Sequence, residues 1–317
     1  MMNLSTPEEE KATPENFRCG IVSIVGRPNV GKSTLLNSLL KEKVAIVSKV
    51  PQTTRNRIRG IYHDPRGQIV FIDTPGLRLG KDTLDKLLLR CSLGSLEDAD
   101  GIIHLVDANE PVGPEEEHLV QKLKPLRIPI ILGLNKVDLK GQCVPEYISL
   151  WERIKGRSIE QMESLVLLPL SGRTGFNREK LLEILFGFLP KGLPLYPPDV
   201  ISDLPQKIAV GDIVREKFFS LLREELPHSL AVEVETIQPR KKVISISAVV
   251  YVERESQKEI VIGKQGQLLK KVGILAREEL EGLLESKVFL ELHVKSKKRW
   301  RDNPSLLKEL GYDDYVS

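Results

Sequence analysis

The sequence is poor in cysteine and has no apolar run long enough to cross a membrane. Its three cysteines, Cys19, Cys91 and Cys143, are odd in number and far apart, which excludes a disulfide framework and a cysteine metal site. The N-terminus also lacks the apolar segment of a secretory signal. The net charge of +3 is too small to indicate a nucleic-acid partner by itself. These absences together predict a cytoplasmic protein.

Strand-like and helix-like segments alternate through the first part of the chain. Residues 1–16 are polar and predict a disordered arm. The alternation in residues 17–189 predicts an α/β fold with a doubly wound sheet. The expected strands are 20–25, 56–63, 68–73, 101–106, 128–134 and 164–170. The expected helices are 32–41, 83–95, 114–124, 146–160 and 177–188. Ligands of such sheets bind beyond the carboxyl ends of the strands, so motifs there are the functional candidates.

A phosphate-binding loop of the pattern G-x-x-x-x-G-K-S lies between the first strand and the first helix, at residues 26–34 (GRPNVGKST). Its backbone N–H groups and the helix N-terminus favour a bound triphosphate. Lys32 is expected to reach the β- and γ-phosphates, and Ser33 to hold Mg²⁺. The predicted contact residues are Gly26, Arg27, Pro28, Asn29, Val30, Gly31, Lys32, Ser33 and Thr34.

A D-x-x-G motif, DTPG at residues 73–76, ends the third strand. Asp73 is expected to hold Mg²⁺ through a water, with Thr74 and Pro75 beside the nucleotide. The Gly76 N–H is expected to touch the γ-phosphate, because glycine allows a close approach. After a phosphate-binding loop, this motif indicates a nucleoside triphosphatase.

The polar stretch PQTTR, residues 51–55, separates these two motifs and leaves no hydrophobic face to bury. A threonine hydroxyl there can complete the Mg²⁺ shell only while a γ-phosphate is present, so the stretch is expected to order and relax with hydrolysis. Thr54 is the preferred candidate and Thr53 the alternative. An ordinary surface loop is the other interpretation of the stretch.

The motif NKVD, residues 135–138, follows the fifth strand and predicts guanine specificity. The Asp138 carboxylate can accept hydrogen bonds from guanine N1 and N2, and would be left unpaired against adenine. Asn135 is expected to tie the loops together, and the Lys136 stem to cover one face of the base. The backbone N–H groups expected to meet guanine O6 belong to Ser171, Gly172 and Arg173.

A proline-rich linker, residues 190–198, leads to a second region with a different pattern, residues 199–301. Its expected elements are a helix at 206–226, strands at 230–237 and 243–253, a helix-turn-helix and a strand at 288–294. The turn is a G-x-x-G loop, which in this order of elements is typical of an RNA-binding KH domain. The predicted RNA contacts there are Ile262, Gly263, Lys264, Gln265 and Gly266. Residues 302–317 are expected to form a tail or a short helix.

A basic run follows the last expected strand. It contains Lys295, Lys297, Lys298, Arg299 and Arg301, and Trp300 interrupts it. Next to a KH loop the cations are expected to contact RNA phosphates, and Trp300 either to stack on a base or to pack inside the protein. A solvated face is the alternative for such a run.

In this order, GRPNVGKST, QTTR, DTPGL and NKVD resemble the Era family of translation-factor-like P-loop GTPases, and residues 17 to 312 resemble its GTPase and type II KH domains. The resemblance implies GTP hydrolysis with Mg²⁺. It also implies binding near the 3′ end of 16S rRNA during small-subunit assembly and allows peripheral association with the inner membrane. The residues implied in catalysis are Lys32, Thr54, Gly76 and Asn29.

Two features modify this expectation. Leu77 stands where many GTPases have a catalytic glutamine, so unassisted hydrolysis is expected to be slow, and the resemblance suggests that Asn29 helps to bind K⁺ instead. Ser171-Gly172 departs from the usual Ser-Ala, which predicts looser base binding. The alternatives are a non-catalytic GTP-dependent RNA clamp and a GTPase of RNA modification. We expect a monomer that does not bind DNA.

Overall fold

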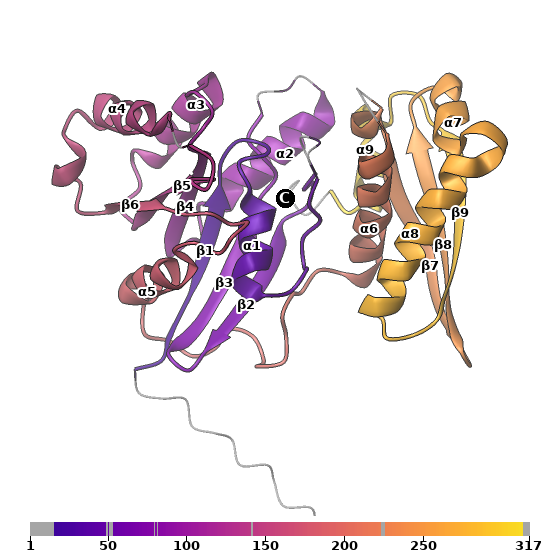
Figure 1. Ribbon diagram of the computed structural model, residues 1–317, viewed down its shortest axis with the longest axis horizontal. Coiled ribbons are helices and arrows are strands. Elements are labelled where there is room, and N and C mark those ends of the chain that lie inside the picture. Colours follow the sequence, from indigo (N-terminus) through magenta and orange to yellow (C-terminus); the bar gives the residue numbers. More distant parts are fainter. Residues whose placement is uncertain are drawn as a thin grey trace, which may run out of the picture.

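The computed structural model describes residues 16–48, 50, 53–78, 80, 82–140, 142–222 and 226–312. The predicted arm up to residue 15, Pro51, Gln52 and residues 313–317 lie outside the described residues. An N-terminal α/β lobe and a C-terminal α+β lobe lie side by side (Figure 1). The fold class predicted from the sequence is confirmed.

The sheet of the N-terminal lobe has the strand order β2-β3-β1-β4-β5-β6. Its strands are β1 (Arg18–Val25), β2 (Ile58–Asp64), β3 (Gly67–Asp73), β4 (Gly101–Asp107), β5 (Ile130–Asn135) and β6 (Leu165–Pro169). β2 runs antiparallel to β3, and the other pairs are parallel. β2 differs because a two-residue turn joins it to β3, whereas a parallel pair needs a crossover.

Helices cover both faces of this sheet. On one face lie α1 (Lys32–Leu40) and α5 (Arg178–Phe188), and on the other lie α2 (Thr83–Gly94), α3 (Pro114–Leu123) and α4 (Val144–Lys155). Every residue of β3, β4 and β5 is buried, as expected for a sheet covered twice. α4 ends earlier than predicted because Gly156 adopts a left-handed conformation with φ 70°.

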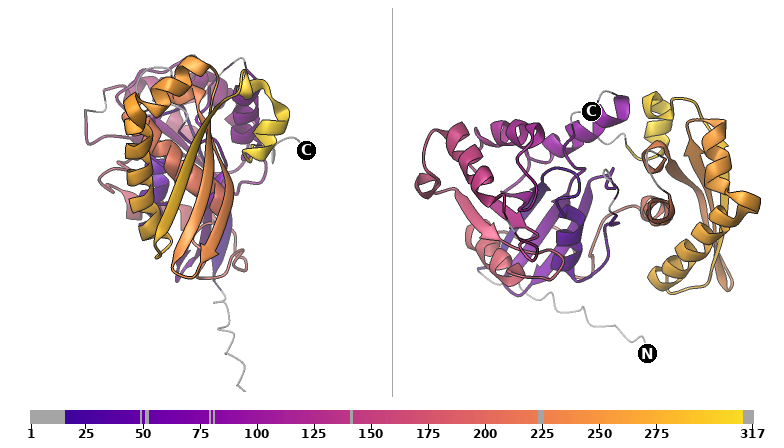
Figure 2. Two further views of the ribbon diagram at one scale, coloured as in Figure 1. Left: turned by 90° about the vertical axis from the view of Figure 1, so that its right-hand side faces the viewer. Right: turned by 45° about the horizontal axis from the view of Figure 1, so that its top comes forward.

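The C-terminal lobe pairs a sheet with helices on one face. Its elements are α6 (Gln206–Leu221), β7 (Ala231–Arg240), β8 (Val243–Val252), α7 (Glu255–Ile262), α8 (Gln267–Leu283), β9 (Val288–Ser296) and α9 (Pro304–Glu309). β7 and β8 are antiparallel, and β8 and β9 are parallel. α6 and α8 bury their apolar side chains against the sheet. Figure 2 shows α6 on the side of this lobe that faces the N-terminal lobe.

The proline-rich linker is bonded to the N-terminal lobe along most of its length. The Gln68 side chain accepts hydrogen bonds from the N–H groups of Leu195 and Tyr196, at 2.7 and 3.0 Å. Farther along, Arg59 forms an ion pair with Asp203 at 2.9 Å. The connector therefore follows the GTPase-like lobe to residue 203, beyond the predicted end of the linker at residue 198.

The two lobes also share an apolar cluster. Leu84, Leu87 and Leu88 of α2 pack with residues that follow β9, among them Trp300 and Leu306. Polar contacts surround this cluster: Arg301 pairs with Asp82 at 2.6 Å and with Asp85 at 3.2 Å. α9 and the residues just before it thus dock on α2, the helix that follows the D-x-x-G motif.

Candidate functional site

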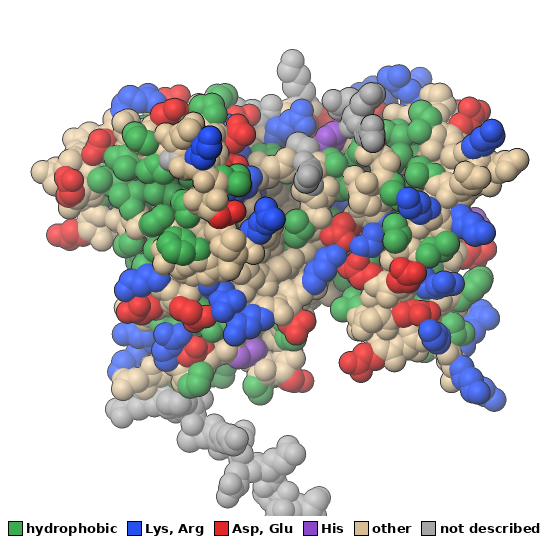
Figure 3. All heavy atoms as spheres, viewed as in Figure 1, with side chains coloured by type: hydrophobic (Ala, Val, Ile, Leu, Met, Phe, Trp, Pro, Cys, Tyr) green, Lys and Arg blue, Asp and Glu red, His purple; other side chains and the backbone are tan. Residues whose placement is uncertain are grey.

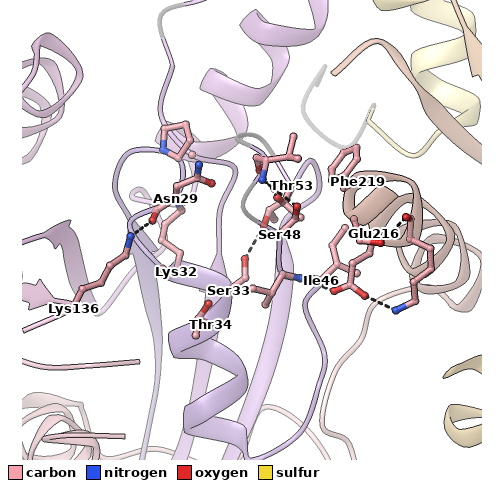
Figure 4. A pocket seen from close by; sticks show the side chains of 18 residues that line it. Asn29, Lys32, Ser33, Thr34, Ile46, Ser48, Thr53, Lys136, Glu216 and Phe219 are labelled. Carbon is pink, nitrogen blue, oxygen red and sulfur yellow. Dashed lines mark hydrogen bonds and ion pairs between the residues drawn. The ribbon is translucent and has the colours of Figure 1, made fainter. Parts of the chain in front are cut away.

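A pocket of about 820 Å³ opens at the carboxyl ends of β1 and β3. Figure 4 shows Asn29, Lys32, Ser33 and Thr34 on one side of it, and Glu216 and Phe219 of α6 on the other. The lining residues are Pro28, Asn29, Gly31, Lys32, Ser33, Thr34, Ile46, Val47, Ser48, Val50, Thr53, Thr54, Gly76, Lys136, Glu216, Lys217, Phe219 and Ser220. The space-filling view shows the surface hollowed between the lobes (Figure 3). The pocket is therefore bounded by both domains.

Lys32 lies on the floor of this pocket, 6% exposed. Its ammonium donates to the carbonyl oxygens of Gly26 and Arg27, at 3.1 and 2.8 Å. Burial lowers the pKa of Lys32 to about 8, although the Asp73 charge opposes this effect. A triphosphate would supply the negative charge that this buried cation lacks.

Ser33, Thr54 and Asp73 converge as a cluster of oxygen atoms. The Ser33 hydroxyl donates to Asp73 Oδ2 at 2.6 Å and lies 2.8 Å from the Thr54 hydroxyl, which donates to the same Oδ2 at 3.3 Å. Asp73 Oδ1 is buried without a hydrogen-bond partner among the described residues. Burial raises the pKa of Asp73 to about 6, against the opposing Lys32 charge. Hard oxygen ligands around an orphaned carboxylate oxygen fit Mg²⁺, and these three residues would hold it.

The D-x-x-G motif closes directly over the phosphate-binding loop. The Leu77 N–H donates to the Gly26 carbonyl at 3.0 Å. A Cβ added to Gly76 would lie 2.6 Å from the Pro28 backbone, so only glycine allows this approach. The Leu77 side chain is 1% exposed and packs in the core beside α3 and α4. Leu77 therefore cannot orient an attacking water, which agrees with the expectation from the sequence.

On the base side of the pocket, Asn135 ties three loops together as predicted. Its Nδ2 donates to the Val30 carbonyl at 2.6 Å, and its Oδ1 accepts from the Gly172 N–H at 2.9 Å. Lys136 donates to the Asn29 carbonyl at 2.8 Å. Asp138 is exposed beside it, with its carboxylate accessible to a base.

The last predicted loop packs more closely than expected. The Ser171 N–H donates to the Phe176 carbonyl at 3.3 Å, and the Gly172 N–H is bonded to Asn135. The predicted guanine O6 contact therefore stays a prediction for Arg173, because the other two donors are engaged within the protein. A Cβ on Gly172 would lie 3.1 Å from the Leu35 nitrogen, so glycine lets this loop rest on α1.

A second candidate site is a groove of about 460 Å³ between α8 and β9, beginning at Gly266. Its apolar lining includes the exposed side chains of Ile274 and Phe289. Lys270 and Arg277 stand along its α8 wall, and neither was predicted. Lys270, Ile274 and Arg277 are four and three residues apart, which places them on one face of a helix. This spacing could have identified the two cations from the sequence. The groove has the apolar lining that nucleotide bases need, and it lies beside the G-x-x-G loop that is expected to hold the RNA backbone.

The basic run lies apart from this groove and is exposed at Lys295, Lys298 and Arg299, with Lys297 half-buried. The stacking role proposed for Trp300 is wrong in this arrangement, because its ring is 0% exposed and its Nε1 donates to the Ser229 carbonyl at 2.8 Å. Trp300 packs between the lobes instead. Sequence reasoning could not separate the two roles, since the surface that covers Trp300 lies more than 200 residues away.

The chain matches two families of known proteins. Residues 21–136 match the family described as 50S ribosome-binding GTPase, and residues 225–301 match the KH domain family. GTPase Era of Geotalea uraniireducens is 45% identical over 303 residues, which cover 95% of this chain and 100% of that protein. GTPase Era of Halothermothrix orenii is 42% identical over 299 residues, 94% of this chain and 99% of its own.

Solved structures agree with these matches. A crystal structure of Era in complex with MgGDPNP and nucleotides 1506–1542 of 16S ribosomal RNA superposes with a TM-score of 0.86 at 40% identity, covering 93% of this chain and 99% of that one. A point variant of Aquifex aeolicus Era bound to GDP.AlF4⁻ gives a TM-score of 0.85 with the same identity and coverage. The match spans both lobes and nearly the full length of each relative. The chain therefore belongs to the Era family of GTPases.

Proposed function

We propose that this chain is a GTP-hydrolysing switch whose KH domain binds 16S rRNA near its 3′ end during assembly of the small ribosomal subunit. The observation that carries the proposal is the convergence of Lys32, Ser33 and Thr54 in a pocket whose far wall is α6 of the KH domain, with Asp73 accepting hydrogen bonds from both hydroxyls. The solved Era complex with MgGDPNP and a 16S rRNA segment supports the ligand and the RNA class.

The protein's part in hydrolysis follows from these positions. Loop amides and Lys32 bind the β- and γ-phosphates, and the Gly76 N–H stabilises charge on the γ-phosphate. Ser33, Thr54 and Asp73 would hold Mg²⁺, which would supply positive charge to offset the charge of the phosphates. Because Leu77 is buried, the water must be oriented by other groups, and we infer a role for Asn29 with K⁺. Asn29 lines the pocket in which the phosphates would bind.

Phosphate release is the direct test of this proposal. We expect slow release from GTP that increases with K⁺ concentration and responds to an RNA carrying the 3′ end of 16S rRNA. No release above the rate in buffer, under any of these conditions, would leave the non-catalytic RNA clamp, which the burial of Leu77 favours. Crosslinking of the bound RNA in cells separates ribosome assembly from RNA modification, because only the former recovers 16S rRNA as the main species.

Base specificity is tested by Asp138→Asn. The exposed carboxylate is expected to accept from guanine N1 and N2, so the amide should lower GTP affinity and favour xanthosine triphosphate. Sites built to accept hydrogen bonds from a substrate reject an analogue that lacks the donor groups by about 10⁴-fold. Affinities for both nucleotides, measured by calorimetry, decide the matter, and unchanged GTP affinity would contradict the assignment. Asp98→Asn, an exposed carboxylate outside the pocket, is the control.

Peripheral association with the inner membrane is the finer part of the proposed location and is supported by the resemblance alone. No helix among the described residues is long and apolar enough to cross a bilayer. Flotation with anionic and with neutral vesicles, each with GDP or a GTP analogue, tests the association. Absence of the protein from both vesicle fractions would leave the cytoplasmic location by itself.

A further inference from the structure

The segment 53–55 is held from two sides. Thr54 faces the oxygen cluster of the nucleotide site, within 2.8 Å of the Ser33 hydroxyl. Its neighbours in sequence are bonded to the KH domain instead: the Thr53 carbonyl accepts from Arg215 at 2.7 Å, and Arg55 donates to the Leu230 carbonyl at 2.8 Å. A residue expected to bind the metal thus sits between two neighbours that are each hydrogen-bonded to the other domain.

Arg215 is a rigid anchor. It projects from α6, is 2% exposed, and forms an ion pair with Asp212 at 2.7 Å. Its second terminal nitrogen donates to the Tyr312 hydroxyl at 3.1 Å. A planar guanidinium with partners at both ends has a fixed direction, so the bond to the Thr53 carbonyl fixes that peptide as well.

Arg55 is buried by groups that belong to the KH domain. Its side chain is 0% exposed, and the partners that the described residues give it are neutral. They are the carbonyls of Leu230 and His228, the Tyr312 hydroxyl and the Trp300 ring, whose centroid lies 5.7 Å from the guanidinium carbon. No carboxylate in the described part of the chain is bonded to Arg55, and the nearby charge of Asp212 comes from α6 of the KH domain. The buried cation is therefore stable only while these groups of the KH domain surround it. If the KH domain moves away, Arg55 returns to water.

We propose that Arg215 and Arg55 are positioning residues for the GTPase reaction: they hold Thr54 where it ligates Mg²⁺ beside the γ-phosphate, so the KH domain completes the nucleotide site. The inference rests on the proposed function, and it names the contacts that connect the nucleotide site with the KH domain. GDP lacks the γ-phosphate and does not use Thr54. Docking of the KH domain therefore favours GTP over GDP, and by reciprocity GTP favours docking.

The test compares affinities for a non-hydrolysable GTP analogue and for GDP in full-length variants. Arg215→Gln and Arg55→Gln should each weaken binding of the Mg²⁺–GTP analogue on the order of tenfold, since each leaves a buried carbonyl unpaired. GDP affinity should stay within about twofold. Half-saturation of the GTP analogue should also require more Mg²⁺. Arg215→Lys, which keeps the charge beside Asp212, should recover part of the loss.

Lys43→Gln is the matched control. Lys43 also joins the GTPase domain to α6, through Glu216 at 2.7 Å, but it is half-exposed and bonds neither Thr53 nor Arg55. It should leave the ratio of GTP to GDP affinity unchanged. Equal losses for both nucleotides in the Arg215 and Arg55 variants would show a merely structural role and overturn the inference.

A double-mutant cycle with Thr54→Ala keeps the inference falsifiable if one variant is unstable. Once Thr54 is removed, Arg55→Gln should no longer change the preference for GTP, because it acts through that threonine. Additive effects would refute the inference. If the wild-type protein itself binds no GTP analogue, the proposed function fails; if it binds normally and the arginine variants match it, only the positioning role fails.

Discussion

Two glycine loops open two long helices in this molecule, and they lie at very different depths. Gly31 caps α1 with φ 102°, and Gly266 caps α8 with φ 74°. Both loops present backbone N–H groups at a helix N-terminus, which favours phosphate. The first loop, here called the deep loop, is followed by the buried Lys32. The second, here called the open loop, carries the exposed Lys264.

This difference teaches that depth, more than loop sequence, determines how strongly such a loop binds. The first loop has a buried cation, an orphaned carboxylate oxygen and walls from both domains. A nucleotide bound there would supply interactions that water cannot supply to these buried groups, so its affinity and specificity should be high. An RNA phosphate at the second loop would have to compete with water for every contact. On the proposed function, the neighbouring apolar groove would add affinity and select the bases.

Removal of the buried cation should have the largest effect. Lys32→Ala is expected to weaken GTP and GDP binding about 100-fold, because a charged hydrogen bond contributes up to about 3 kcal/mol. Calorimetry gives the affinities, and thermal unfolding should confirm an intact domain. Lys122→Ala, an exposed lysine on α3, is the control. Near-normal binding by the Lys32 variant would mean that the deep loop behaves like the open one.

A negative charge in the open loop should have the next largest effect. Space above Gly266 is clear, since an added Cβ would meet nothing within 4 Å. Gly266→Asp should therefore fold and yet weaken binding of a 16S rRNA 3′-end fragment by about tenfold, through repulsion of phosphates and strain at positive φ. Gly282→Asp, on an exposed part of the same helix, adds the same charge without that strain. Equal RNA affinities for the two variants would argue against this loop as the RNA site.

The smallest effect is a pH dependence confined to the deep loop. Burial lowers the pKa of Lys32 to about 8 and raises the pKa of Asp73 to about 6. As pH rises above 8, Lys32 loses the proton that attracts phosphate, so nucleotide affinity should fall up to about tenfold by pH 9. Below pH 6, Asp73 gains a proton and Mg²⁺-dependent binding should also weaken.

Fluorescence titration of a labelled nucleotide at constant Mg²⁺ measures both limbs of this profile. Lys32→Arg should remove the alkaline limb, because guanidinium stays protonated throughout the range. An alkaline limb that persists in the arginine variant would assign it to another group. RNA binding over the same range should not follow the two limbs.

The positions of the GTPase motifs could be predicted because each depends on local sequence. Asp73 and Asn135 each end an apolar strand, and such runs are visible without knowledge of any neighbour. The antiparallel direction of β2 follows from the short turn at Pro65 and Arg66, although it was not predicted. Element boundaries differed mostly by one to three residues, except where a cap such as Gly156 ended a helix early.

The contacts between the domains could not be predicted in this way. Arg55 belongs to a polar stretch, and Trp300 to a basic run, and both patterns indicate a solvated surface. Both side chains are buried because each meets the other domain. Residues joined across such sequence distances leave no periodic pattern in either segment, so only the three-dimensional arrangement reveals them.

The order of synthesis gives the apolar cluster on α2 a further consequence. Leu84, Leu87 and Leu88 are translated long before Trp300 and Leu306, the residues that cover them. More than 200 residues lie between the leucines and the residues that cover them. At a translation rate of about 5 to 20 residues per second, the covering residues are made roughly 10 to 40 seconds later. During that interval Leu84, Leu87 and Leu88 of the nascent GTPase domain are uncovered, and transiently exposed apolar surface of this kind favours aggregation. The contact between α2 and the KH domain can form only after residues 300–312 have left the ribosome.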